Sequence, residues 1–306
     1  MLQVDNLTKV YGRQKALDGV TFSVQDAQVA GLLGPNGAGK STLMKIVCGY
    51  LAPTAGTAKV CGLDVREHSL EARARIGYLP EHNPLYLDMY VREYLDFAGR
   101  IYMPAKEVAR RREEVLERTG LAPESNKKIK ALSKGYRQRL GLAQALIHDP
   151  DVLILDEPTS GLDPNQLEEV RMLIREIGRQ KTVILSTHIM QEAEAVCDRV
   201  LLLDHGRLVA DSSTRELMQG LHGQVSVRVE FKGAVQENVL ALLDGVRSVH
   251  SLSEGCYELV SGADTDLRPL LFRLAVEKGW EILTLQREER RLESVFHQLT
   301  QEKEAD

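Results

Sequence analysis

A glycine-rich octapeptide between an apolar strand and an amphipathic stretch constrains the fold of this chain more than any other segment. It fits the pattern G-x-x-x-x-G-K-[ST]. Its residues are Gly34, Pro35, Asn36, Gly37, Ala38, Gly39, Lys40 and Ser41. Residues 29–33 before it are apolar or small, and apolar residues recur at helical spacing over residues 40–50. A glycine turn that leads from a strand into a helix directs several backbone N–H groups toward one anion. The octapeptide therefore predicts a phosphate-binding loop in an α/β fold, with Lys40 placed to reach the β- and γ-phosphates of a nucleotide and Ser41 to ligate Mg²⁺.

A pair of carboxylates follows an apolar strand much later in the chain. Residues 152–155 are all apolar, and Asp156 and Glu157 come directly after them. A carboxylate at the C-terminal end of a strand beside a phosphate loop is placed to hold Mg²⁺, directly or through water. The second carboxylate can orient and deprotonate an attacking water. Such a strand end is common by itself, and the phosphate loop upstream is what favours the catalytic interpretation.

Two further segments have both a structural and a functional interpretation. Residues 132–139 lead into a helix expected over residues 140–147. Ser133 either helps to bind a phosphate at the start of this helix or caps the helix above a basic, exposed first turn. His188 follows a strand expected over residues 182–186. A lone histidine after a strand is often structural, but this one is expected at the sheet edge that carries the other motifs. The residues alone leave both alternatives open.

Composition excludes several classes of protein. Lys and Arg number 39 against 44 Asp and Glu, a net charge of −5, and the pI is about 6.0. This balance argues against a generally basic nucleic-acid binder, because counterion release needs clustered Lys and Arg. No apolar run approaches the ~20 residues of a membrane helix, and the N-terminus lacks the pattern of a signal peptide. The four cysteines lack the paired spacing of a zinc or redox site, so we expect them to be small buried apolar residues in a reducing cytoplasm.

Strand and helix signals alternate over residues 1–220 and predict one α/β domain with a helical insertion. Helices expected over residues 93–101 and 107–119 lie in this insertion, and with the helix that follows they make a helical subdomain of about residues 84–150. A strand is expected over residues 57–65. A polar run at residues 211–214 comes next, and a domain boundary is expected near residues 220–223.

Residues 221–306 predict a small α+β module of their own. Residues 225–231 alternate between apolar and polar side chains, which is typical of a half-buried strand. The expected elements after it are a helix over 234–243, strands over 246–252 and 257–260, a helix over 267–276 and a strand over 280–285. This β-α-β-β-α-β order is typical of ferredoxin-like modules. A last amphipathic helix is expected over residues 292–300.

Taken together and in this order, the segments resemble the ATP-binding subunits of ABC transporters over about residues 2–215. Residues 34–41 with Thr42 match the Walker A loop, and Asp156 with Glu157 matches the end of the Walker B strand. Residues 132–138 are similar to the signature loop and residues 160–163 to the D-loop, which ends at Asp163.

Two single residues add to the resemblance, His188 at the position of the switch histidine and Tyr11 at the position of the aromatic that stacks on adenine. Within the family, the chain is most similar to single-domain ATPases that serve ABC-2-type permeases. Residues 78–81, 133–136 and 162–166 are similar to a subgroup associated with gliding motility.

The resemblance implies an ATPase that works as a head-to-tail homodimer, with two ATP molecules and Mg²⁺ between the subunits. Each ATP would be held by Lys40, Ser41 and Asp156 of one protomer and by Ser133 and Gly135 of the other. Glu157 would be the general base, and His188 would hold the γ-phosphate.

The resemblance also implies an integral membrane permease as the partner, with residues 84–130 docked against it. The permease would select the cargo, and export is the expected direction. The chain is expected in the cytoplasm, peripheral on the inner face of the cell membrane, with no nucleic acid as a partner.

Three positions depart from the family pattern. Glu81 stands where most members have a glutamine that senses Mg²⁺ and water, so an added charge is expected beside the nucleotide and the metal. Lys134 and Tyr136 replace a glycine and a glutamine of the signature loop. We interpret Lys134 as solvated rather than directed at the partner's ATP.

Two alternatives to a transport ATPase remain open. One is a soluble ABC-type ATPase that acts on nucleic acid in repair or translation. Such relatives usually carry two heads, a coiled-coil insertion or a basic arm, whereas this chain has one head and an acidic tail. The other is an assembly or regulatory subunit in which the tail binds partners and hydrolysis is secondary.

Overall fold

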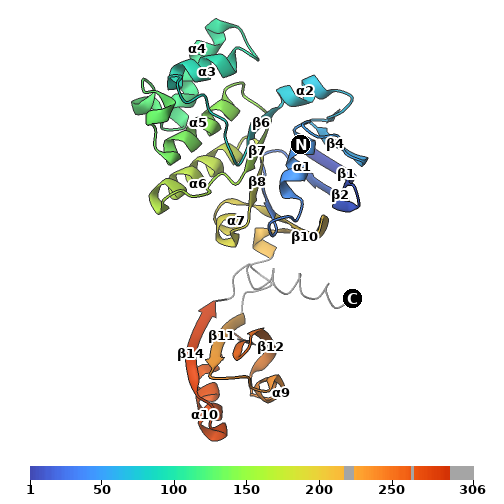
Figure 1. Cartoon of the computed structure of the whole chain (residues 1–306), viewed down its shortest axis with the longest axis vertical. Helices are drawn as coiled ribbons and strands as arrows, with labels where there is room; N and C mark the ends of the chain where they lie inside the picture. The colour runs from blue at the N-terminus through green and yellow to red at the C-terminus, as the bar shows by residue number, and fades with distance from the viewer. Residues whose placement is uncertain (217–223, 263–264, 290–306) are drawn as a thin grey trace. The chain divides into compact units, whose positions relative to one another are not determined.

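The computed structural model describes residues 1–216, 224–262 and 265–289 of the 306-residue chain. The chain divides into two compact units, Met1–Thr214 and Arg215–Asp306. Figure 1 shows the elements of each unit. The boundary expected near residues 220–223 and the helix expected over residues 292–300 lie outside the described residues. None of the described helices combines the length and the apolarity needed to cross a membrane.

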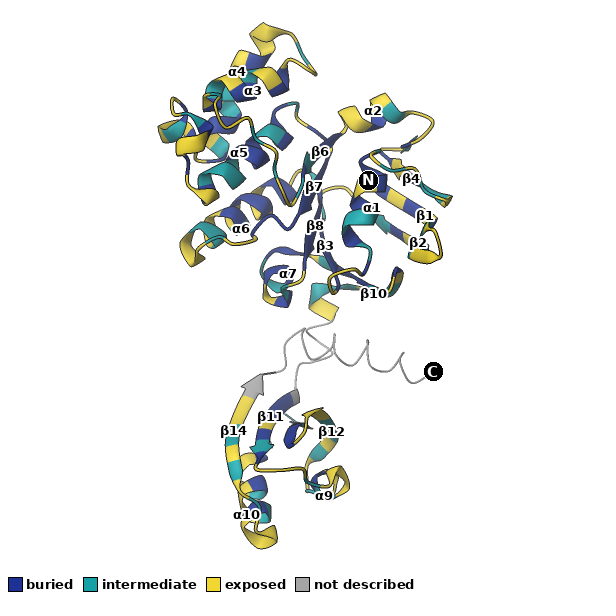
Figure 2. Cartoon of the chain, in the orientation of Figure 1, coloured by how far each residue is buried: buried dark blue, intermediate teal, exposed yellow. Residues whose placement is uncertain are grey.

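The first unit is built around a six-stranded sheet in the order β10-β9-β3-β8-β7-β6. Five of these strands run parallel, and β10 pairs antiparallel with β9 at one edge. The strands are β3 (Val29–Leu33), β6 (Ile76–Leu79), β7 (Val152–Asp156), β8 (Thr182–Thr187), β9 (Arg199–Asp204) and β10 (Arg207–Ser213). All residues of β3, β7 and β8 are buried, and Figure 2 shows these strands as one dark layer. A parallel sheet covered on both faces gives such continuous apolar strands, so the loops at its C-terminal edge are positioned by a rigid core.

Helices cover both faces of this sheet (Figure 1). The helix α1 (Lys40–Val47) buries Leu43, Met44 and Ile46 in a core shared with the face of β3 that carries Ala30 and Leu32. The opposite face is covered by α5 (Lys134–Leu146), α6 (Pro164–Gly178) and α7 (Met190–Val196). The phosphate loop joins β3 to α1, as the sequence predicts.

A second, antiparallel sheet completes the core on the α1 side. Its order is β2-β1-β4-β5, with β1 (Leu2–Tyr11), β2 (Gln14–Val24), β4 (Ala55–Val60) and β5 (Leu63–Asp64). The strand predicted over residues 57–65 is therefore divided in two. Cys61 and Gly62 have φ values of 49° and 81°, so the chain turns sharply there and β5 folds back onto β4.

The helical insertion contains α3 (Val91–Gly99), α4 (Ala105–Arg118) and two short 3₁₀ turns, Ala122–Glu124 and Ile129–Ala131, before α5. A further short helix, α2 (Ser69–Ala74), precedes β6. The helices predicted over residues 93–101, 107–119 and 140–147 are confirmed, and α5 begins six residues earlier than expected. The residues of the signature-like loop thus form the first turn of α5.

The polar run at residues 211–214 closes the first unit. Residues 211–213 belong to β10, which pairs with β9 through a tight turn at His205 and Gly206. Backbone pairing to an existing edge strand overrides the weak strand propensity of Asp and Ser.

The second unit has the predicted β-α-β-β-α-β order. Its elements are β11 (Gln224–Phe231), α9 (Glu237–Ala241), β12 (Val246–Ser253), β13 (Cys256–Gly262), α10 (Arg268–Lys278) and β14 (Ile282–Glu289). The sheet is antiparallel in the order β12-β13-β11-β14, with Val227, Val229, Leu259 and Leu271 in a core of its own. The predicted α/β head with a ferredoxin-like module is confirmed as a fold.

One helix of this unit is shorter than predicted. The sequence favours a helix over residues 234–243, but α9 begins at Glu237. The hydroxyl of Tyr257 accepts a hydrogen bond from the Val235 N–H (3.2 Å) and donates one to the Val235 carbonyl (2.7 Å). Both backbone groups that would start the helix are therefore already engaged.

All four cysteines are free. Cys48, Cys197 and Cys256 are buried as predicted, and Cys61 is exposed at the turn between β4 and β5. Burial raises the pKa of the Cys48 and Cys197 thiols well above the ordinary value, which keeps these thiols neutral and unreactive.

Candidate functional site

The phosphate loop owes its shape to glycines in backbone conformations that other residues avoid. Gly34, Gly37 and Gly39 have φ values of 154°, 85° and 107°. A Cβ atom at Gly34 would collide with the carbonyl oxygen of Leu203 on β9, and one at Gly39 with the carbonyl oxygen of Ala16. A Cβ atom at Gly37 would meet nothing within 4 Å. The loop therefore lies directly against two neighbouring backbone segments.

This difference between two glycines predicts two different losses of stability. Gly37→Ala should cost about 1–2 kcal/mol, because a left-handed conformation is unfavourable for alanine. Gly39→Ala adds a collision with backbone to the same strain, so we expect it to cost at least about 2 kcal/mol more. Denaturant unfolding of the two nucleotide-free variants measures the difference. Equal midpoints for both variants would contradict the close packing around Gly39.

Lys40 lies folded back over the loop. Its Nζ donates hydrogen bonds to the carbonyls of Gly34 (2.7 Å) and Pro35 (3.1 Å), and the residue is only 7% exposed. Burial lowers the pKa of Lys40, although the carboxylates of Glu157, Asp156 and Glu81 oppose this shift. The ammonium group is thus held close to the loop by weak carbonyl acceptors that an anionic phosphate could replace.

Asp156 ends β7 and is almost fully buried. Its Oδ1 accepts a hydrogen bond from Ser186 Oγ (2.6 Å) and lies 3.4 Å from Ser41 Oγ. The Ser186 hydroxyl in turn accepts a hydrogen bond from the Glu157 N–H (2.9 Å). Ser186 is a positioning residue that the sequence did not single out, although a small polar residue in the apolar strand β8 is a signal that could have been used.

The donor set around Asp156 suits Mg²⁺. The ion prefers oxygen ligands and is usually bound by one or two carboxylates together with substrate phosphates and water. Ser41 Oγ and Asp156 Oδ1 already face each other at 3.4 Å. Among the described residues there is no cluster of three acidic, histidine or cysteine side chains that would hold a metal ion unaided. Oxygen atoms of a bound nucleotide would have to complete the coordination.

Glu157 has a φ of 49°, a left-handed conformation that is rare outside glycine. The two oxygens of its buried carboxylate lie 3.0 Å and 3.1 Å from Nδ1 of His188. The side chain of His188 is 52% exposed. The structure therefore brings His188 into the site and ties it to the second carboxylate. A strained backbone at this point is consistent with a functional constraint on where the carboxylate points.

These groups surround a cavity of about 370 Å³. It is lined by Tyr11, Gln14, Ala16, Asn36, Gly37, Gly39, Lys40, Ser41, Thr42, Glu81, Asp156, Glu157, Ser160 and His188. Gln14, Ala16 and Ser160 are additions to the predicted set. Tyr11 is 47% exposed, and Nζ of Lys9 lies over its ring, 5.2 Å from the ring centre. The Glu81 side chain is half exposed. Gly34, Pro35 and Ala38 shape the loop instead, and the Ala38 N–H donates to the Pro35 carbonyl (3.2 Å).

Three predicted site residues, Ser133, Gly135 and Asp163, are not among the described residues that line this cavity. Ser133 is exposed and caps α5, where its hydroxyl accepts a hydrogen bond from the Tyr136 N–H (3.3 Å). Asp163 is exposed and caps α6, accepting from the N–H groups of Asn165 (3.1 Å) and Gln166 (3.0 Å). The capping interpretation of Ser133 is therefore confirmed, and a phosphate contact would have to come from outside the protomer.

The two departures in the signature loop, Lys134 and Tyr136, lie at the start of α5. Lys134 is exposed, with its ammonium group against Gly161 of the D-loop. The ring of Tyr136 lies 5.6 Å from the guanidinium of Arg139 on the same helix. Gly135 is buried against the side-chain amide of Gln166, so a larger residue there would displace this side chain.

Comparison with known proteins identifies the family. Residues 17–160 match the family described as ABC transporter. The chain is 41% identical over 220 residues to the Nod factor export ATP-binding protein I of Ralstonia nicotianae, covering 71% of this chain and 68% of the relative. It is 32% identical over 306 residues to the linearmycin resistance ATP-binding protein LnrL of Bacillus subtilis, covering 98% of both chains.

Solved structures that resemble this chain point to the same family. An ATP-binding subunit of an ABC transporter superposes with a TM-score of 0.65 at 30% identity, over 72% of this chain and 92% of that chain. The ATP-binding cassette MJ0796, in a dimeric post-hydrolysis state bound to ADP and Pi, superposes with a TM-score of 0.65 at 26% identity, over 70% of this chain and 99% of that chain. Comparison by sequence and comparison by fold therefore find the same relatives for the chain that carries the glycine loop, the two carboxylates and the histidine. This chain belongs to the ATP-binding subunits of ABC transporters, which are ATPases.

Proposed function

We propose that this chain hydrolyses ATP to power a separate integral membrane permease of the ABC-2 type, in the export direction. The observation that carries the proposal is the convergence of Lys40, Asp156 and the Glu157–His188 pair on one cavity of about 370 Å³. The names of the relatives support the direction, since they include an export protein and antibiotic-resistance proteins.

ATP would bind with its phosphates in the loop between β3 and α1. The backbone N–H groups of residues 36–41 and the N-terminus of α1 favour negative charge there. Lys40 would exchange its two carbonyl acceptors for phosphate oxygens, and Thr42 lines the same end of the cavity. The adenine would stack on the ring of Tyr11, which lines the same cavity.

Ser41 and Asp156 are the residues that would hold Mg²⁺, with the half-exposed Glu81 at the margin of the same site. The chemistry that Mg²⁺ would supply there is positive charge against the phosphate oxygens. Ser186 fixes the Asp156 carboxylate in the required orientation through its 2.6 Å hydrogen bond.

Hydrolysis needs an attacking water and an acceptor for its proton. Glu157 would take this proton while the water oxygen bonds to the γ-phosphorus and the bond to the ADP oxygen breaks. The hydrogen bond from the Glu157 N–H to the Ser186 hydroxyl and the contact of the carboxylate with His188 limit where the carboxylate can point. His188 is exposed enough to turn toward a γ-phosphate once ATP is bound.

The absence of Ser133, Gly135 and Asp163 from the described residues that line the cavity of their own protomer supports a head-to-tail homodimer. A hydroxyl and backbone N–H groups at the start of α5 suit a phosphate, yet they lie outside the cavity of their own protomer. In the dimer they would meet the γ-phosphate held by Lys40 of the other protomer. The dimer cassette among the structural relatives is consistent with this arrangement.

Closure of the dimer would reach the permease through the helical insertion, which would place the chain on the inner face of the cell membrane. The insertion presents Tyr86, Tyr90, Phe97 and Ile101 to solvent, each at least 46% exposed. Exposed apolar side chains of this density are typical of a protein interaction surface.

The proposal is tested by affinity purification of tagged Glu157→Gln protein, with ATP and Mg²⁺, from detergent-solubilised membranes of the source organism. Co-purification of a polytopic membrane protein, lost with the Lys40→Ala variant, is the expected result. Co-purification of only non-membrane partners or nucleic acid would contradict the proposed permease partner, while the proposal that the chain hydrolyses ATP would stand.

A further inference from the structure

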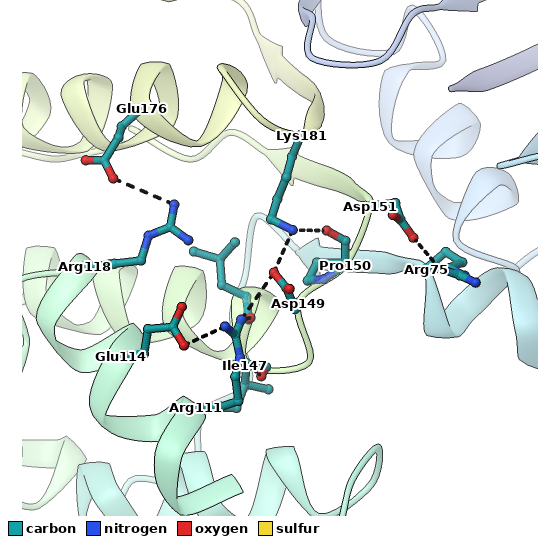
Figure 3. A network of polar contacts seen from close by, with 11 residues as sticks. Arg75, Arg111, Glu114, Arg118, Ile147, Asp149, Pro150, Asp151, Glu176 and Lys181 are labelled. Carbon is teal, nitrogen blue, oxygen red and sulfur yellow. Dashed lines mark hydrogen bonds and ion pairs between the residues drawn. The ribbon is translucent and has the colours of Figure 1, made fainter. Parts of the chain in front are cut away.

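A network of polar contacts centred on one buried arginine joins the helical insertion to the parallel sheet at the C-terminal end of α5 (Figure 3). At its centre is Arg111 of α4, which is 7% exposed. Its guanidinium donates to the carbonyls of Leu146 (3.3 Å) and Ile147 (3.4 Å), and it pairs with Glu114 (2.7 Å) on its own helix. The last carbonyls of α5 are therefore capped by a side chain of α4.

Asp149 connects this cap to the sheet. Its Oδ1 lies 3.3 Å from Arg111 and 2.8 Å from Nζ of Lys181, which also donates to the Pro150 carbonyl (2.6 Å). Lys181 immediately precedes β8, the strand that carries Ser186 and leads directly to His188 at the site. One carboxylate is thus shared between a cation of the insertion and a cation of the catalytic sheet.

The surroundings of Asp149 favour the charged form. Burial opposes ionisation, but the hydrogen bond from Lys181 and the charges of Lys181, Arg111 and Arg118 outweigh it and lower the pKa of Asp149. A second ion pair beside it, Arg118 of α4 with Glu176 of α6 (3.8 Å), also crosses from the insertion to the sheet side. The network is therefore a charged connection between two parts of the first unit.

The helix α5 extends from this network to the signature-like loop. It has 13 residues, a length of roughly 20 Å, and begins at the cap residue Ser133. Because a helix is stiff, the position of its C-terminal end relative to the sheet sets the position of Ser133 and Gly135 at the other end.

We infer that Arg111 and Asp149 are positioning residues for hydrolysis, because they fix the end of α5 and thereby the placement of Ser133 and Gly135 against the ATP held by the partner protomer. The inference rests on the proposed head-to-tail dimer. Neither residue touches nucleotide. Among the described residues, those that line the ATP cavity include none from α4 or α5, so binding of ATP to its own protomer does not depend on the network.

The test compares Asp149→Asn with the matched control Asp151→Asn. Asp151 lies two residues away in the same loop, is similarly exposed (47% against 59%) and pairs with an arginine, Arg75, at 3.0 Å. Arg75 ends α2 of the core, so this pair does not reach the insertion. Asn tolerates the φ of 56° at position 149, so the substitution removes the charge without adding backbone strain.

We would measure three quantities for both variants of the full chain: the Kd for an ATP analogue, the kcat for ATP and the thermal midpoint. ATP-driven dimerisation is measured with each variant combined with Glu157→Gln. We expect Asp149→Asn to lower kcat about fivefold and to raise the protein concentration needed for dimerisation by a similar factor, with Kd unchanged. Asp151→Asn should leave all of these quantities as in the wild-type protein. Asp149→Glu, which keeps the charge, should recover most of the lost kcat.

Two outcomes would overturn the inference. One is a kcat for Asp149→Asn that equals the kcat of Asp151→Asn. The other is a loss of kcat with a parallel rise in Kd or a fall in thermal midpoint, which is the signature of a purely structural residue. Failure of the proposed function looks different, since the unmodified chain would then lack ATPase activity or the Glu157→Gln protein would not dimerise.

Discussion

Glu157→Gln is expected to bind ATP and Mg²⁺ normally, to hydrolyse ATP at less than about 1% of the wild-type rate, and to accumulate as a dimer. The amide has the shape of the carboxylate and can keep its contact with His188 at about 3 Å. It cannot accept a proton from the attacking water, so the bound ATP persists. Removing one negative charge beside the γ-phosphate also relieves repulsion in the closed dimer. Single-turnover hydrolysis and size-exclusion chromatography with saturating ATP measure the two effects.

Glu192→Gln is the matched control for this experiment. Glu192 is equally buried on α7 and accepts a hydrogen bond from Thr187 Oγ1 (2.6 Å), at the end of the same strand as Ser186. It does not belong to the described residues that line the cavity. We expect it to hydrolyse ATP at a rate close to wild type. A Glu157→Gln protein that stays monomeric at saturating ATP would contradict the head-to-tail dimer, and one with normal turnover would contradict the role of Glu157.

The parts of the site that could be predicted from sequence are those whose geometry is local. The phosphate loop needs only a strand, three glycines and a helix start within a dozen residues, and the structure has all of them in order. The same holds for Asp156 and Glu157, because an apolar strand fixes where its last residue emerges. The bounds of α3, α4 and β7 follow from periodicity to within two residues, whereas α1 ends at Val47, before the expected end at residue 50.

Residues that depend on distant partners could not be predicted. Ser186 matters because β8 lies beside β7 in the sheet, so that its hydroxyl reaches both Asp156 and the Glu157 N–H. The strand at residues 211–213 exists because β9 offers it an edge, and α9 is shortened by a tyrosine 22 residues further along the chain. Sequence could not choose between the two interpretations of Ser133 for a related reason. Its cap bond is local, whereas any phosphate contact requires a second protomer.

Lys40→Met is expected to reduce ATP hydrolysis at least about 100-fold without destabilising the nucleotide-free protein. The Lys40 ammonium is nearly buried and is held by two neutral carbonyls, so the folded state disfavours its charge and the pKa is lowered. A lysine whose pKa is lower in the folded state binds its proton less tightly there, so it makes folding less favourable at neutral pH, where the unfolded chain is protonated. Methionine removes this cost and keeps most of the apolar stem.

The thermal midpoints of the wild-type and Lys40→Met proteins should therefore respond differently to ATP and Mg²⁺. Without nucleotide, the variant should unfold at the same temperature as the wild type or at a higher one. With ATP and Mg²⁺, only the wild type should shift upward, because only a protein that binds the ligand is stabilised by it. Lys45→Met on the exposed side of the same helix is the control and should keep the shift. If Lys40→Met retained the ATP-dependent shift, the nucleotide would have to bind away from the loop between β3 and α1. If the variant unfolded well below the wild type without nucleotide, the Lys40 ammonium would instead be a net stabilising partner of Glu157, Asp156 and Glu81.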